Sequence, residues 1–172
     1  MRLDAATRDI LEKWTRSDTD PPGICDGSWT ALFMKLFPMS QSYAVCPQKR
    51  HGAHGDLIME VAKVLPSESH TERRLRILLV VEIKNPQHWD SGKEKLLQQL
   101  EHQTDLAFKT TELGAAKDKL FWIASIGPHW QYGEKKYGQT LNPLIEWHHD
   151  ALDDASFLDL EKLAELVGSL DE

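Results

Sequence analysis

Apolar residues recur along the chain with two spacings, one typical of helices and one typical of strands. Helical spacing predicts helices over 3–14, over 28–38, where the hydroxyl of the first residue can cap the helix, and over 93–110. The Pro-Pro-Gly sequence at 21–23 is expected to be a turn that separates the first two helices. A closing amphipathic helix is predicted over 155–170.

Four further segments have the apolar runs or alternation typical of strands: 42–50, 56–65, 75–84 and 119–126. The segment 127–139 contains glycine and proline and reads as a loop or hairpin, and 140–147 reads as an edge strand interrupted by Pro143. We therefore expect an α/β (α+β) fold with a central mixed sheet of four to five strands flanked by helices.

Composition and length are those of one ordinary globular domain spanning 1–172. Of 172 residues, 41% are hydrophobic and 27% are charged, and no apolar stretch reaches the roughly 18 residues that a membrane helix needs. The N-terminus has no continuous apolar block of the kind found in secretory signals. We expect an intracellular protein, cytoplasmic or nuclear, with no membrane partner. Cys25 and Cys46 are expected to be free thiols, and a disulfide between them is the alternative.

The net charge of −7 is concentrated in the acidic C-terminal extension, 139–172, which has nine acids and one base. Residues 1–138 have 19 bases and 18 acids, so this larger part of the chain is close to neutral. Such a body can face nucleic acid, although it lacks a long basic stripe. The acidic extension could instead recruit a protein partner.

Charged residues mark the ends of two predicted strands. Glu82 and Lys84 end the apolar run over 75–84, and as residues i and i+2 of a strand they should point to the same face. Asp56 begins the preceding strand. Consecutive strands of this kind are usually antiparallel neighbours, so we expect all three charged groups to converge at one end of the sheet.

Two converging carboxylates repel each other, and a divalent cation with oxygen ligands relieves that repulsion most simply. We expect Mg²⁺ or Mn²⁺ to be bound by Asp56, Glu82 and the main-chain carbonyl of Ile83. The ion could lower the pKa of a water molecule, while Lys84 could orient that water or neutralise charge on phosphoryl oxygens. These groups suit the hydrolysis of phosphodiester bonds.

Gly55-Asp56, Glu82-x-Lys84 and the glutamine-bearing helix after them resemble the PD-(D/E)XK nuclease superfamily. The resemblance covers 28–126 and implies a restriction-endonuclease-like core with the order helix, three antiparallel strands, helix, strand. It implies metal binding by Asp56 and Glu82 and catalytic support by Lys84. Gln99 takes the place of the glutamine in the QxxxY motif of the RecB-like branch, with Gln103 where a tyrosine is usual. Superfamily members that cut duplexes are often homodimers.

Each of these residues also has a structural interpretation. Glu82 and Lys84 could be a solvated ion pair at a strand end, and Gln103 could hydrogen-bond at the core border. Aromatic residues at 129–132 could stack on bases or simply pack under a loop. The leading hypothesis is a metal-dependent nuclease acting on DNA or RNA, and the alternative is a catalytically silent binding or scaffolding module on the same fold.

Overall fold

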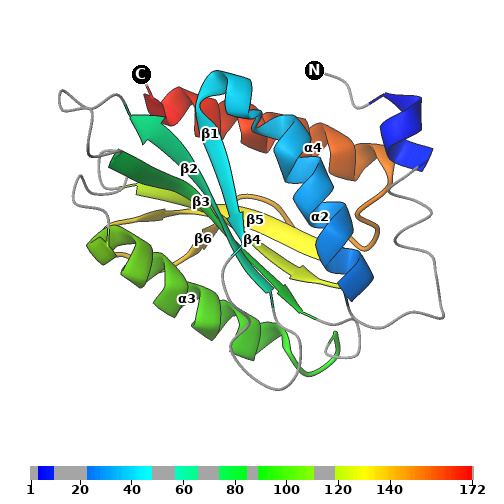
Figure 1. The fold of residues 1–172 in the computed structure, drawn as a ribbon. Helices are drawn as coiled ribbons and strands as arrows, with labels where there is room; N and C mark the ends of the chain where they lie inside the picture. The colour runs from blue at the N-terminus through cyan, green and yellow to red at the C-terminus, as the bar shows by residue number, and fades with distance from the viewer. Residues whose placement is uncertain are drawn as a thin grey trace.

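The computed structural model describes residues 4–9, 23–47, 57–65, 74–84, 89–110 and 119–171. Within these ranges a six-stranded sheet runs in chain order from β1 at one edge to β6 at the other (Figure 1). The strands are β1 (Tyr43–Pro47), β2 (Leu57–Leu65), β3 (Arg74–Lys84), β4 (Lys119–Ile126), β5 (His129–Lys136) and β6 (Asn142–Pro143). The longer helices are α2 (Gly23–Leu36), α3 (Lys93–Thr110) and α4 (Asp154–Gly168).

Helices cover both faces of the sheet, each over its own apolar cluster. Figure 1 shows α2 and α4 on one face and α3 on the other. Alternate residues of β3 point to opposite faces, so Val81 and Ile83 join the cluster under α2 and α4 while Val80 joins the cluster under α3. The aromatic residues of the first cluster include Trp29, Phe33, Phe37, Trp130 and Phe157.

The sheet is mixed because α3 connects two parallel strands. β3 pairs parallel with β4, whereas every other pairing in the described sheet is antiparallel. The carboxyl ends of β3 and β4 therefore lie side by side, with Lys84 opposite Ile126. The main-chain N–H of Gly127 donates to the carbonyl of Lys84 over 3.0 Å and holds the two ends together.

The α/β class predicted from the sequence is confirmed, and so are the helices over 93–110 and 155–170. The second helix begins at Gly23, five residues before the predicted start at Ser28. Pro21 and Pro22 lie outside the described residues, and Ser28, which was predicted to cap the helix, lies within it. Residues 5–9 are helical, and the rest of the helix predicted over 3–14 lies largely outside the described residues. None of the described helices is long and apolar enough to cross a membrane.

The predicted count of four to five strands was wrong because β5 lies in the segment that was read as a loop or hairpin. β5 returns antiparallel to β4 through a turn at Gly127, whose φ is 58°. The glycine at 133, which suggested a loop, is a packing requirement. A Cβ there would lie 2.2 Å from the carbonyl oxygen of Asn142 and 2.4 Å from the Trp122 ring.

Candidate active site

Glu82 and Lys84 lie at the carboxyl end of β3 and are both buried, with 2% and 5% of their surface exposed. Glu82 pairs with Ala124 and Lys84 with Ile126, and both partners belong to the apolar cluster under α3. Paired residues of neighbouring strands point to the same face, so both charged side chains lie on the α3 side of the sheet. This burial excludes the interpretation of Glu82 and Lys84 as a solvated strand end.

The start of β2 lies beside these residues, as the antiparallel interpretation required. Leu57 is the direct partner of Ile83, and Ile58 is the direct partner of Glu82. Asp56, which directly precedes Leu57 in the chain, lies outside the described residues, as does Gly55. Leu57, the residue that follows Asp56, therefore lies beside the carboxyl end of β3.

α3 passes over the same face and contributes Gln99. Leu96 and Leu100 are fully buried against the sheet, and Gln99 between them is half-buried. Its side-chain oxygen Oε1 is buried and has no hydrogen-bond partner among the described residues. A buried acceptor oxygen without a donor destabilises a fold, so it is a polar group available to a ligand or to water. Gln103, one turn later, is also half-buried.

Gln131 on β5 is a polar residue near the site that the sequence interpretation missed. It pairs with Ala124, the residue that also pairs with Glu82, so these three residues form a row across three strands. Gln131 is 6% exposed, and its Nε2 donates to the carbonyl of Ile145 over 2.9 Å. The signal in the sequence was the alternation of apolar Trp130 and Tyr132 around a polar residue, which is typical of a strand.

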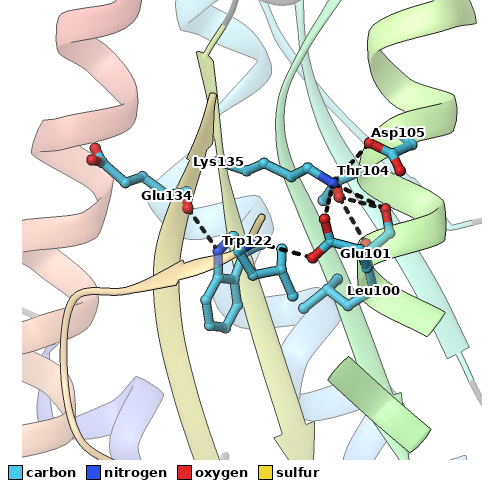
Figure 2. A network of polar contacts seen from close by, with 8 residues as sticks. Leu100, Glu101, Thr104, Asp105, Trp122, Glu134 and Lys135 are labelled. Carbon is cyan, nitrogen blue, oxygen red and sulfur yellow. Dashed lines mark hydrogen bonds and ion pairs between the residues drawn. The ribbon is translucent and has the colours of Figure 1, made fainter. Parts of the chain in front are cut away.

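An ion network around one buried lysine connects α3 to the sheet. Lys135 on β5 is fully buried, and its Nζ lies 2.6 Å from Glu101 Oε1 and 2.8 Å from Asp105 Oδ1, both on α3. Figure 2 shows Lys135 reaching from its strand to these two carboxylates. Glu101 Oε2 in turn accepts a hydrogen bond of 3.0 Å from the main-chain N–H of Leu141. This network sets the position of the helix that carries Gln99.

The aromatic residues at 129–132 have two different roles. Trp130 and Tyr132 are 0% and 1% exposed and belong to the core under α2 and α4, so the packing interpretation is correct for them. His129 is only half-buried and stacks on Trp89 at a centroid distance of 3.7 Å. Burial, His149 and Lys93 together lower the pKa of His129, which favours the neutral imidazole.

Three further residues with a carboxylate or thiol side chain lie away from the site or outside the described ranges. Glu60 is half-buried in the middle of β2, opposite Cys46 of β1. Cys46 is a free thiol, and burial raises its pKa. The side chain of Cys25 lies outside the described part of the chain.

Within the described ranges, no group of three or more histidine, cysteine, aspartate or glutamate side chains is placed to hold a metal ion. The described residues supply one carboxylate at the end of β3, Glu82, and α3, on the same side of the sheet, carries the amide oxygen of Gln99. These are hard oxygen donors of the type that Mg²⁺ and Mn²⁺ prefer. The donor types therefore fit the expected ion, with the second carboxylate, Asp56, beyond what is described.

No protein-family model, curated protein or solved structure matches the sequence. The order from α2 to β4 is helix, three antiparallel strands, helix and strand. Unrelated proteins share such orders of elements, so the order alone does not assign a family. The functional argument therefore rests on the chemistry of the site.

Proposed function

We propose that the chain is a metal-dependent nuclease that hydrolyses phosphodiester bonds of DNA or RNA. The observation that carries the proposal is the burial of Glu82 and Lys84 on one face at the end of β3, where 2% and 5% of their surface is exposed. Burying a carboxylate and an ammonium group destabilises a fold unless specific interactions offset the lost hydration. Ionisable groups placed in such environments cluster at functional sites, and buried ion pairs with a structural role share this feature.

The proposed metal ligands are Asp56, Glu82 and the main-chain carbonyl of Ile83, with Mg²⁺ or Mn²⁺ as the ion. When bound, the ion would supply positive charge beside the scissile phosphate and would favour ionisation of a water molecule. Leu57 faces Ile83 across the strands, so the chain approaches the end of β3 directly after Asp56. This pairing supports the inclusion of Asp56.

The proposed roles of Lys84 and Gln99 follow from their chemistry and from their shared side of the sheet. The ammonium group of Lys84 would orient the attacking water or stabilise negative charge that develops on the phosphoryl oxygens. The buried Oε1 of Gln99 would accept a hydrogen bond from that water or from Lys84. Hydrogen bonds and charge stabilisation of this kind act over short distances, so the contribution of Gln99 depends on the position of α3. The ion pair of Lys135 with Glu101 helps to fix that position.

Cleavage assays on single- and double-stranded DNA and RNA test the proposal. We expect wild type to cleave at least one substrate with Mg²⁺ or Mn²⁺ and to lose this activity in EDTA. The Glu82→Gln variant, which keeps the size of the side chain but removes its charge, should not cleave. Lys95→Ala is the control, because Lys95 is exposed on α3. Inactivity of wild type on every substrate and metal, together with tight binding of nucleic acid or protein, would favour the silent module.

A further inference from the structure

Two histidines meet at the end of the sheet, apart from the residues of the candidate active site. His129 is the first residue of β5, and His149 follows the short strand β6. The Nδ1 atoms of the two rings lie 3.3 Å apart. His129 pairs with Ile126, which pairs with Lys84, so His129 lies in the same row as Lys84 but two strands away.

The backbone holds these two histidines opposite each other. Trp130 and His148 form an antiparallel bridge with main-chain hydrogen bonds of 3.0 and 2.8 Å in the two directions. One step outward on each segment places His129 directly opposite His149. Side chains of directly opposed residues start about 4.5–5.5 Å apart at Cβ and point to the same face. The approach of the two rings is therefore set by the fold.

Trp89 restricts the rings further. It stacks on His129 with an interplanar angle of 12°, and it meets His149 edge to face at a centroid distance of 5.8 Å. The Nζ of Lys93 lies 3.8 Å from the centroid of the Trp89 ring. Imidazoles held in this way lose little conformational entropy when they bind a ligand, because their rotamers are already restricted.

The distance between the Nδ1 atoms allows a hydrogen bond between the two rings, and it also matches the separation of two ligands on one metal ion. Two nitrogens bound to a tetrahedral Zn²⁺ at about 2.0–2.1 Å lie about 3.3 Å from each other. Imidazole nitrogen is a ligand for Zn²⁺, Cu²⁺ and Ni²⁺, whereas Mg²⁺ prefers oxygen. The pair is thus chemically distinct from the carboxylate site proposed for Mg²⁺ or Mn²⁺.

We propose that His129 and His149 form a two-histidine site for a divalent transition-metal ion such as Zn²⁺, with water completing the coordination. The bound ion joins the start of β5 to the segment that follows β6. This site does not depend on the proposed nuclease function, because none of its residues belongs to the candidate active site.

Calorimetric titration of the full, metal-stripped chain with ZnCl₂ tests the site. We expect saturable binding by wild type and at least about tenfold weaker binding by His129→Ala and by His149→Ala, since each variant removes one of two ligands. His149→Asn is a second variant that keeps a polar, hydrogen-bonding side chain, and we expect the same weakening. His102→Ala is the matched control, because His102 is a solvent-exposed histidine on α3. Glu82→Ala is expected to bind Zn²⁺ as wild type does.

A second readout locates the ion. Ni²⁺ and Cu²⁺ should quench part of the tryptophan fluorescence of wild type, because Trp89 contacts both rings and Trp147 packs against Trp89. This quenching should be lost in His149→Ala and kept in His102→Ala. Unchanged Zn²⁺ affinity in His129→Ala and His149→Ala would overturn the proposal, since the ion would then bind elsewhere. Absence of any Zn²⁺ binding by wild type would also overturn it and leave the contact as a hydrogen bond only.

Discussion

Leu57 and Ile83 are direct partners in the antiparallel pairing of β2 with β3. Leu57 directly follows Asp56 in the chain, and Ile83 stands between Glu82 and Lys84. The three charged residues of the proposed nuclease site, Asp56, Glu82 and Lys84, are therefore each adjacent in the chain to a residue of this one pair.

Metal binding at this site should appear as thermal stabilisation. We expect millimolar Mn²⁺ to raise the melting temperature of wild type by several degrees, because an ion that binds the folded state alone stabilises it by RT ln(1 + [L]/Kd). Asp56→Ala and Glu82→Ala should each lose most of this shift in differential scanning fluorimetry. Asp90→Ala removes an exposed carboxylate and should keep the shift. Equal shifts in all four proteins would place the ion elsewhere.

Lys84 should affect cleavage more than binding. We expect Lys84→Ala to bind nucleic acid with nearly unchanged affinity and to cleave on the order of 10²-fold more slowly, the usual effect of removing one electrostatic stabiliser. Lys84→Arg should also be impaired, because a planar guanidinium cannot take the place of a compact ammonium group. Single-turnover rates and binding isotherms measure the two effects. Undiminished cleavage by Lys84→Ala would remove the lysine from the mechanism and keep the nuclease.

The side chain of Lys135 should contribute far more to the free energy of unfolding than that of Lys136, the next residue in the chain. Lys135→Met leaves the Glu101 and Asp105 carboxylates without their buried cation, and we expect a loss of about 1–3 kcal/mol in urea unfolding. The value lies below that for a fully buried pair because the two acidic side chains are 34% and 49% exposed. Lys136→Met is the control, since Lys136 is exposed on the same strand. Similar losses in both variants would contradict this assignment.

Gly133 should tolerate no side chain. Its added Cβ would lie 2.2 Å from the carbonyl oxygen of Asn142, so Gly133→Ala forces β5, β6 or Trp122 to move. We expect a loss of about 1–3 kcal/mol, as for other overpacked sites. Gly168→Ala, whose added Cβ would lie 3.8 Å from the Tyr43 hydroxyl, should be neutral or stabilising in the same unfolding assay. A stable Gly133→Ala protein would show that Trp122 repacks without strain.

The sequence correctly predicted elements in which the spacing of apolar residues reflects the side of the element that packs on the core. α3 was predicted with its observed bounds because its apolar residues follow the helical period, and the common face of Glu82 and Lys84 followed from the period of a strand. β5 was missed because Gly133 looked like a loop residue, and only the position of the Trp122 ring on a neighbouring strand explains it.

The sequence could not predict which charged residues are buried. Lysine is almost never fully buried without a partner, and the partners of Lys135 lie 34 and 30 residues earlier in the chain. The same limit applied to Glu82 and Lys84, whose burial depends on β4 and α3 packing over the end of β3. The spacing of residues predicts the face of a strand or helix on which a side chain lies. The burial of that side chain depends on elements that are distant in the sequence.

The parallel pairing of β3 with β4 has a consequence for the order of folding. The β4–β5 hairpin can form from neighbouring residues, but β3 meets β4 only after the intervening segment with α3 has closed a long loop. We expect Glu82 and Lys84 to remain hydrated until that step and to lose their water after the rate-limiting step of folding. Substitutions at these two residues should therefore change the unfolding rate more than the folding rate.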